Sequence, residues 1–560
     1  MTLRLRAFVL LVAGACSLQA AGYNVSGVVV DSQSQKPLAN ARVALAPTRE
    51  RLEKLEQVTK QDGRFSFALG PAGKYSLQVS KPGYPTQLYR APFFVGLSSA
   101  IAVRDGQDTA HIVFEAVRGG VIAGQVKDED SDPVANALVT IFQSLIVSGE
   151  RRLVTRGQMR ANARGGFRFA NLLRGSYYIC AMGRPWFTDS LAQFGGMRSV
   201  AVDANRDVGD ASDAPVRPKF QPPQFSPDPD LSGTAFVTTF YPRAQSIEEA
   251  SAIRLDPGGE VQLSITLPLA KAVTVKGTIS SSGQGSAGRA NLVKKVNSQY
   301  VLFLDTLVTK EGTFEFDNVP PGTYEVAAVS DAGSGASSWG ARQEIEVGAS
   351  DLGVNLRPVP MAAFSGRVRF EGEPPPSPTN LFVMLRNSDG NTARIQVDAQ
   401  GNFSSTRLLP GRYDVTAGSA DYAASYFVGP SGEHLPLVLE TNGEPIHRDL
   451  TLTRAVSVIE GTVEHNAAPH VGALVILVPK DLSAYGAYRQ DQTDSDGSYR
   501  LAAVAAGDYW LIAVDEPEVA YRDPKVAAKL IAAAKPIHVQ AGEHLDQKIE
   551  VTAVSALPLP

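Results

Sequence analysis

Cysteine is almost absent from this chain of 560 residues, which contains only Cys16 and Cys180. Cys16 lies in a short apolar run near the N-terminus that has the features of an export signal. Removal of that signal would leave Cys180 alone. One thiol cannot form an internal disulfide, so we expect packing, rather than cross-links, to hold the fold together.

Long apolar runs and an excess of charge of one sign are also missing. After the N-terminus, no stretch reaches the roughly 18 apolar residues of a membrane-spanning helix. We therefore expect no transmembrane segment once the signal is removed. Acidic and basic residues are interspersed and give a net charge of −4. A chain without a basic face is a poor match for nucleic acid, so no nucleic-acid partner is expected.

Residue patterns for catalysis and metal binding are scarce. None of the seven histidines has Glu three positions later, and His-Glu-x-x-His does not occur, so the ligand pattern of a zinc peptidase is missing. No Gly-x-Ser-x-Gly nucleophile elbow is present. We expect no catalytic residues, no metal and no cofactor. A Gly-x-Gly-x-x-Gly match at 283–288 is interpreted as a hairpin loop, because a strand and not a helix is expected after it. The Asp494–Gly497 turn begins like a calcium loop but lacks the later ligands, which favours a turn over weak calcium binding.

Residues 1–21 are predicted to be a signal peptide. Two arginines precede the apolar run 7–16, and the small residues Ala20 and Ala21 follow it. The protein is therefore expected outside the cytoplasm, in the periplasm, at the cell surface or secreted. Small residues just before Cys16 leave lipid anchoring through that cysteine as a second, less favoured alternative.

Five copies of a glycine–aromatic cassette organise the chain. In each copy, a glycine followed two residues later by Phe or Tyr stands ten positions before a second glycine, which is followed two residues later by Tyr. The glycine pairs are Gly63 and Gly73, Gly165 and Gly175, Gly312 and Gly322, Gly401 and Gly411, and Gly497 and Gly507. A third glycine opens a β-type run 35 to 41 residues before each cassette, at Gly27, Gly124, Gly277, Gly366 and Gly461. This fixed order predicts an internal repeat.

The repeat divides the chain into five modules of about 90 residues or more, a normal size for a β-sandwich. We predict modules one to five at 22–116, 117–270, 271–360, 361–454 and 455–554, and a tail at 555–560. Module two contains an interruption at about 183–232 that is rich in Pro, Asp and Ser, which predicts a long surface loop. Module five holds the only good helix candidate, Pro524 to Lys535.

The second strand of each cassette alternates between apolar and polar residues. In module one, Tyr75, Leu77 and Val79 share one face, while Ser76 and Gln78 lie on the other. One face is then buried and the other faces solvent, as in an antiparallel sandwich. The cassette glycines are predicted at turn positions with positive φ.

The order Gly-x-Val/Ile, Asp-x-x-Gly-x-Phe/Tyr and Gly-x-Tyr resembles the carboxypeptidase regulatory-like domain, which is similar to transthyretin-like and Cna B-type sandwiches. The resemblance implies an all-β fold, a tandem array of five prealbumin-like (transthyretin/Ig-like) antiparallel β-sandwich modules. It also implies an extracytoplasmic, non-catalytic protein and a carbohydrate-binding-like fold. Module two departs most from the pattern, because Ala163-Arg164-Gly165 lacks the aspartate.

These observations favour an exported, non-catalytic protein that acts as a cell-surface spacer, adhesion or binding element. Two alternatives are a carbohydrate-binding protein of the extracytoplasmic space and an accessory or regulatory subunit of a secreted peptidase. The expected partner is a polysaccharide or another cell-surface protein.

Three tryptophans are candidate contact residues, because exposed Trp stacks on sugar rings and anchors protein partners. They are Trp510, Trp339 and Trp186. Trp510 follows Tyr509 and is expected to point away from the core face of its strand. Local packing under loops or against the next module is the alternative for all three.

Overall fold

The computed structural model describes residues 23–556 except for 49–53, 70, 92–96, 184–232, 281–287, 297–298, 331–338, 372–380, 388–391, 420–421, 427–435, 441–442, 454–456 and 483–486. The predicted signal peptide, Cys16, Trp186 and residues 184–232 of the predicted loop lie outside this described part. No helix within it is long and apolar enough to cross a membrane.

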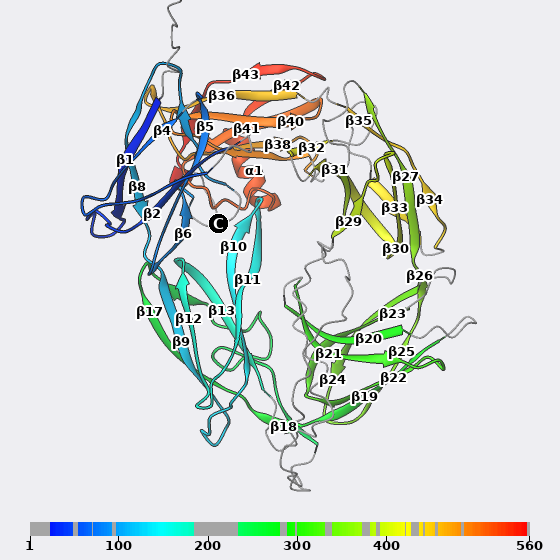
Figure 1. The fold of residues 1–560 in the computed structure, drawn as a ribbon. Coiled ribbons are helices and arrows are strands. Elements are labelled where there is room, and N and C mark those ends of the chain that lie inside the picture. The colour runs from blue at the N-terminus through cyan, green and yellow to red at the C-terminus, as the bar shows by residue number, and fades with distance from the viewer. Residues whose placement is uncertain are drawn as a thin grey trace, which may run out of the picture. The chain divides into compact units, whose positions relative to one another are not determined.

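Strands dominate the described residues, which confirms the all-β fold class (Figure 1). The chain divides into two compact units, the smaller built on module one and the larger running through 117–493 and 497–560. The predicted module ranges serve below as names for groups of strands, and their boundaries stay a prediction.

Module one contains two sheets. In the first, of order β4-β1-β8, the opening strand β1 is antiparallel to β4 and parallel to β8. In the second, of order β3-β2-β5-β6, β7 also pairs with β5. The strands are β1 (Tyr23–Asp31), β2 (Arg42–Pro47), β3 (Leu55–Val58), β4 (Arg64–Leu69), β5 (Gly73–Lys81), β6 (Tyr84–Leu88), β7 (Ile101–Val103) and β8 (Thr109–Ala116).

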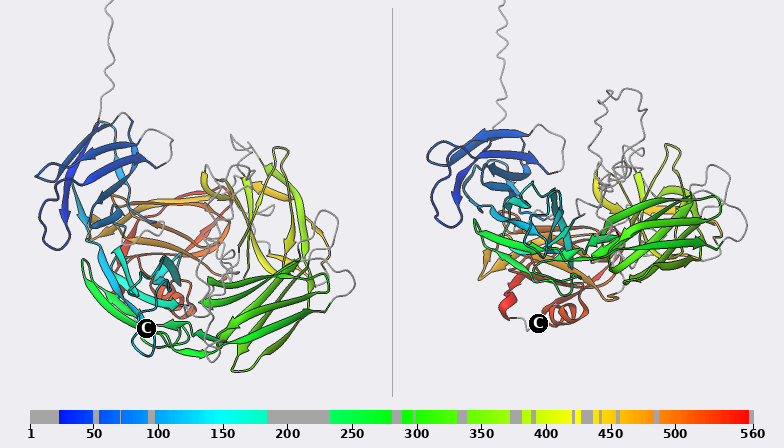
Figure 2. Two further views of the ribbon diagram at one scale, coloured as in Figure 1. Left: turned by 60° about the horizontal axis from the view of Figure 1, so that its bottom comes forward. Right: turned by 90° about the horizontal axis from the view of Figure 1, so that it is seen from below.

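Modules two and three repeat this plan, with sheets β12-β9-β17 and β11-β10-β13-β15 in module two and β22-β19-β25 and β21-β20-β23-β24-β26 in module three. Figure 2 shows the strands of module three (green) lying alongside one another. The strands of module two are β9 (Gly120–Lys127), β10 (Leu138–Val147), β11 (Glu150–Arg160), β12 (Gly166–Leu172), β13 (Gly175–Met182), β14 (Thr234–Phe236), β15 (Thr239–Phe240), β16 (Ile253–Leu255), β17 (Glu260–Thr266) and β18 (Leu269–Lys271). Those of module three are β19 (Val273–Ile279), β20 (Gly288–Val296), β21 (Gln299–Val308), β22 (Thr313–Val319), β23 (Gly322–Ser330), β24 (Trp339–Val347), β25 (Leu352–Leu356) and β26 (Val359–Pro360).

Modules four and five follow the same plan, and in module five β44 pairs with both β36 and β41, which joins the two sheets. The strands of module four are β27 (Ala362–Glu371), β28 (Leu381–Asn387), β29 (Thr392–Gln396), β30 (Asn402–Leu408), β31 (Gly411–Ser419), β32 (Tyr422–Tyr426), β33 (Pro436–Leu439), β34 (Ile446–His447) and β35 (Leu450–Thr453). Those of module five are β36 (Ser457–His465), β37 (Ala468–Pro469), β38 (Leu474–Pro479), β39 (Arg489–Gln492), β40 (Ser498–Val504), β41 (Gly507–Val514), β42 (Lys535–Val539), β43 (His544–Asp546) and β44 (Ile549–Thr552), with a short 3-10 helix at Val554–Ala556.

The tyrosine of the second cassette strand is buried in all five modules, at 5% exposure or less. Its hydroxyl donates to the carbonyl oxygen four residues earlier, which satisfies a polar group inside an apolar core. The five bonds are Tyr75 to Pro71 (2.8 Å), Tyr177 to Leu173 (2.6 Å), Tyr324 to Pro320 (3.0 Å), Tyr413 to Leu409 (2.9 Å) and Tyr509 to Ala505 (3.0 Å). The repeated tyrosines therefore anchor strands inside the sandwiches.

The cassette glycines occupy the turns that the sequence predicts. The first glycine of each cassette has φ between 67° and 86°, the left-handed region in which other residues are strained. Glycine is required at the opening position for a different reason, which is clearest in module three. A Cβ at Gly277 would lie 1.8 Å from Cζ of Phe314, so only glycine lets this aromatic ring cross the strand.

In module two, an asparagine takes the place of the aspartate that is missing from the cassette turn. Asn162 lies three residues before Gly165, and its Oδ1 accepts from the amides of Arg164 (2.9 Å) and Gly166 (2.8 Å). Asp398 makes the same pair of bonds in module four, at 2.9 and 2.7 Å. An asparagine amide oxygen therefore replaces the carboxylate, because the turn requires only an acceptor.

The five-stranded sheet of module two is covered on both faces. One face belongs to the main core, which includes Ile141 and Ile179. The other forms a second apolar cluster of Phe142, Leu153, Cys180, Phe240 and Ile247. The cover comes from the segment after the interruption. The structure divides it into β14, which pairs with β18, and β15, which pairs with β13.

The predicted helix of module five is confirmed as α1 (Pro524–Ala533). It begins after Asp523, whose carboxylate accepts from the amides of Lys525 and Val526 as an N-cap. Val526, Ala527 and Leu530 form its buried face. The helix ends before the predicted Lys535 because that residue begins β42, which pairs with β41.

Candidate functional site

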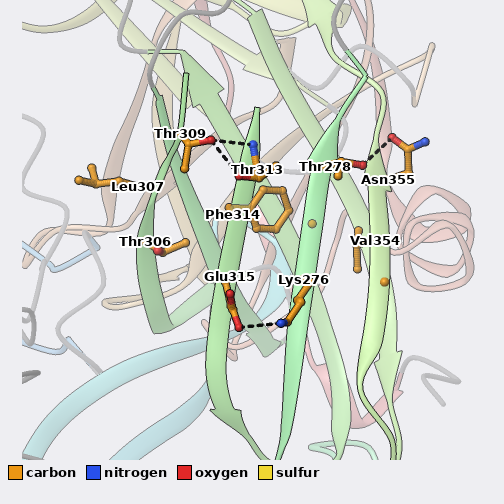
Figure 3. A pocket seen from close by; sticks show the side chains of 12 residues that line it. Lys276, Thr278, Thr306, Leu307, Thr309, Thr313, Phe314, Glu315, Val354 and Asn355 are labelled. Carbon is orange, nitrogen blue, oxygen red and sulfur yellow. Dashed lines mark hydrogen bonds and ion pairs between the residues drawn. The ribbon is translucent and has the colours of Figure 1, made fainter. Parts of the chain in front are cut away.

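A groove of about 740 Å³ lies on module three (Figure 3). Three adjacent strands, β22, β19 and β25, form its floor, and the end of β21 forms one side. The residues that line it are Lys276, Gly277, Thr278, Thr306, Leu307, Thr309, Thr313, Phe314, Glu315, Gly353, Val354 and Asn355.

Strand alternation places the polar side chains of this groove on the outward face. Lys276 and Thr278 are exposed on β19, while Val275 before them and Ile279 after them are buried. The register sets Lys276 opposite Glu315, and their Nζ and Oε1 atoms lie 3.3 Å apart. The sequence signal for this face is the alternation that also predicts the core: the polar residues that alternate with the buried ones form the outward face.

Hydroxyl and amide groups continue the row of cross-strand pairs (Figure 3). Thr278 Oγ1 donates to Asn355 Oδ1 at 3.5 Å, a contact that the parallel pairing of β19 with β25 makes possible. Thr309 and Thr313 share a hydrogen bond of 2.8 Å at the turn between β21 and β22. These groups can donate to and accept from a bound polar chain.

The apolar part of the groove comes from Leu307 and Phe314. Leu307 is 67% exposed on β21, so its aliphatic side chain is accessible at the side of the groove. Phe314 is buried, and its ring edge lies against Gly277. The lining holds no histidine, cysteine or serine, and its lysine is paired with a glutamate. Such a surface offers apolar, hydroxyl and amide contacts to a bound molecule.

Lys294 is a buried amine of module three, a type of group that can act as a nucleophile when its pKa is lowered. Its side chain is 6% exposed, and burial lowers the pKa of its ammonium group. The ammonium lies 5.6 Å from the centre of the Tyr324 ring, a cation–π distance. The hydroxyl of Tyr324 already donates to Pro320, so this tyrosine is not poised to exchange a proton with Lys294.

The structure separates the tryptophans that the sequence singles out. Trp510 lies in β41 of module five, between Val478 of β38 and Pro536 of β42, and is half-buried. Trp339 begins β24 of module three and packs partly buried against that module's core. Neither lines the groove. Their role as contact residues, like that of Trp186, stays a prediction.

Within the described part of the chain, no group of three or more His, Cys, Asp or Glu side chains could hold a metal ion.

Comparison with known families tests the resemblance directly. Residues 24–114 match the family model of the carboxypeptidase regulatory-like domain. The predicted resemblance is therefore confirmed for the module that contains β1 to β8. This domain type is non-catalytic.

Comparison with curated proteins finds no match. Among solved structures, a streptococcal ancillary pilin is 10% identical with a TM-score of 0.19, covering 60% of this chain and 98% of the pilin. Two B repeat units of the collagen-binding protein Cna of Staphylococcus aureus are 12% identical with a TM-score of 0.12, covering 77% and 99% of the two chains. The minor pilin GBS52 of Streptococcus agalactiae is 11% identical with a TM-score of 0.21, covering 44% and 95%. Values this low carry no inference about ligands or partners.

Proposed function

We propose that this protein is an exported, non-catalytic array of β-sandwich modules that acts at the cell surface as an adhesion or binding element. The groove of module three is its binding face, and the other modules serve as spacer and support. Its localisation follows from the predicted signal peptide.

One observation supports this assignment above the others: the repeated residues build the sandwich, and the outward residues differ. The opening glycine and the cassette tyrosine recur in every module. The residue before the opening glycine does not, being Lys276 in module three, Ser26, Ser365 and Glu460 in modules one, four and five, and the buried Ala123 in module two. A constant framework with a variable outer face is what a binding array requires.

The chemistry of the groove favours an extended segment of another surface protein as the partner. Leu307 offers an exposed aliphatic surface against which an apolar side chain of a partner can pack. Thr278 and Asn355 offer hydroxyl and amide groups at hydrogen-bond spacing along the floor. An extended peptide presents side chains and backbone polar groups in alternation, so it matches both features.

Localisation is the first test. Intact cells that express the full chain with a C-terminal epitope tag are treated with a non-permeant protease, and the tag is followed by immunoblot. We expect loss of the tag without loss of a cytoplasmic marker. A chain that stays protected until the cells are lysed would contradict surface exposure.

The binding face is tested by adherence of the same cells to surfaces coated with extracellular proteins. Leu307→Asp should reduce adherence at least tenfold, because it places a charge where an apolar contact is needed. Val58→Asp is the matched control, since Val58 is an aliphatic side chain that is 56% exposed and is not among the residues that line the groove. If cells with both variants adhere as strongly as wild-type cells, the groove is not the binding face.

The two alternatives predict different outcomes. A carbohydrate-binding protein should bind polysaccharides on a glycan array and lose that binding on Trp510→Ala, while Leu307→Asp has no effect. An accessory subunit should co-purify with a secreted peptidase from the culture medium.

A further inference from the structure

The β10–β11 hairpin of module two carries its tip beyond the sheet that supports it. β10 pairs with β13 only as far as Ser144, whereas its pairing with β11 continues to Val147 opposite Glu150. Ser148 and Gly149 form the two-residue turn, with φ of 49° and 79°. The tip therefore projects a glycine and a glutamate away from its own module.

A tyrosine of module five receives this tip. The carbonyl oxygen of Gly149 accepts from the amide of Arg522 at 3.0 Å. A Cβ at Gly149 would lie 2.4 Å from Cε2 of Tyr521, so the bare backbone of the turn lies against the ring. Figure 1 shows the hairpin tip (cyan) beside α1 (orange-red). Both segments belong to the larger compact unit.

The ring that contacts the tip is itself held in place. The hydroxyl of Tyr521 donates to Gln490 Oε1 at 2.7 Å, and the ring stacks on Tyr488 with centroids 5.9 Å apart. The guanidinium of Arg522 lies 5.2 Å from the centre of the Tyr488 ring. Arg522 has only 10% of its side chain exposed. The receiving surface is thus held in place by contacts within module five.

The charges on the two sides are complementary. Glu150 Oε2 lies 3.0 Å from Nη2 of Arg386, and its Oε1 lies 3.4 Å from Nη1 of Arg522, while Arg152 of the same hairpin also contacts the carboxylate. Burial alone would raise the pKa of Glu150, but the three arginines together lower it below its ordinary range. A buried arginine that lost its carboxylate would be left without that compensating charge.

We propose that the Val147–Glu150 tip and the Tyr521–Arg522 surface form an intrachain latch that joins module two to module five, with Arg386 of module four as an auxiliary contact. The occupant of the surface is the chain's own hairpin. The latch stands independently of the proposed binding face of module three.

Hydrogen exchange of the full chain tests the latch at the amide that forms it. In wild type, the amide of Arg522 should exchange slowly because it donates to Gly149. Gly149→Val should raise the exchange rate of the 519–523 peptide at least tenfold, since its Cβ would overlap the Tyr521 ring. The matched control is Gly106→Val, where φ is a similar 75° but nothing lies within 4 Å of the added Cβ. It imposes the same backbone strain without touching the surface.

Glu150→Gln provides a second variant that keeps the shape and removes the charge, so the test stands even if the glycine variant fails to fold. We expect a three- to tenfold faster exchange of 519–523, with module-three peptides unchanged. Wild-type exchange rates in both variants would overturn the latch. Protection that falls on dilution would also overturn it, because the hairpin of a second copy would then occupy the surface.

Discussion

At the scale of single residues, the repeated glycines answer two different physical demands. The cassette glycines supply positive φ, as the sequence predicts from their spacing. Gly277 instead makes room for the ring of Phe314, which belongs to a strand that begins at Thr313. Spacing along the chain predicts the first demand because turns are local. It does not reveal the second, because the ring comes from a distant segment.

Gly277→Ala should destabilise module three by about 2 kcal/mol or more, since a methyl group placed 1.8 Å from the Phe314 ring forces the core to shift. Gly353→Ala on the neighbouring strand β25 is the control, because nothing lies within 4 Å of its Cβ. Urea denaturation of both variants gives the free energies of unfolding. Equal losses would show that backbone flexibility, rather than space, determines the glycine at position 277.

The buried tyrosines predict how stability depends on alkaline pH. Burial raises the pKa of Tyr177 to about 12, and it also raises the pKa values of Tyr324 and Tyr509. An unfolded tyrosine has a pKa of about 10. The folded state therefore favours the neutral phenol, and this contribution is fully present below pH 10 and lost as pH rises toward 12.

The free energy of unfolding should accordingly stay constant up to about pH 9 and fall above pH 10. Urea midpoints between pH 7 and 11.5 measure it, and phenolate absorbance at 295 nm reports ionisation. Tyr177→Phe should make the decline shallower. Phenolate absorbance at pH 11 equal to that of the urea-unfolded chain, with an unchanged midpoint, would contradict burial of these hydroxyls.

At the scale of elements, the sequence predicts where strands lie and which of their faces is buried better than it predicts which strands pair with each other. Tyr324, Val326 and Ala328 alternate with less buried residues, and all three lie in the core. The helix at Pro524 was predictable because its cap and composition are local. The groove was not predictable, because Asn355 reaches Thr278 only when β25 pairs parallel to β19 across a separation of 77 residues. Likewise, the apolar Phe142 of β10 indicates that the outer face of its sheet is buried. The sequence does not reveal which residues cover it, because Phe240 and Ile247 follow the 183–232 interruption.

The doubly covered sheet of module two predicts an unreactive thiol. Cys180 lies in its second apolar cluster at 1% exposure, and burial raises the pKa of its thiol to about 12. The thiolate is the reactive form, so native protein should react with an aromatic disulfide reagent at pH 8 at least 1,000-fold more slowly than the unfolded chain. The chain from residue 22 onward, with and without guanidinium chloride, provides the comparison. Full labelling of native protein within minutes would show that the outer face is open.

At the scale of the whole molecule, the described apolar cores stay within module limits. The clusters of modules three, four and five draw their residues from 273–356, 362–450 and 459–549, respectively. A unit with its own core folds independently when it buries enough apolar surface, and about 90 residues is sufficient in many β-sandwiches. The predicted boundaries are therefore also predicted folding boundaries.

Residues 271–360 expressed alone should fold cooperatively, because the core that includes Val275, Tyr324 and Leu356 lies inside this range. The control is 316–405, a segment of the same length that divides the cores of modules three and four. The first should give a dispersed amide NMR spectrum and a single sigmoidal urea transition, and the second should give neither. A folded 316–405 or an unfolded 271–360 would place the folding unit elsewhere. In that case the glycine spacing would mark strands without marking domains.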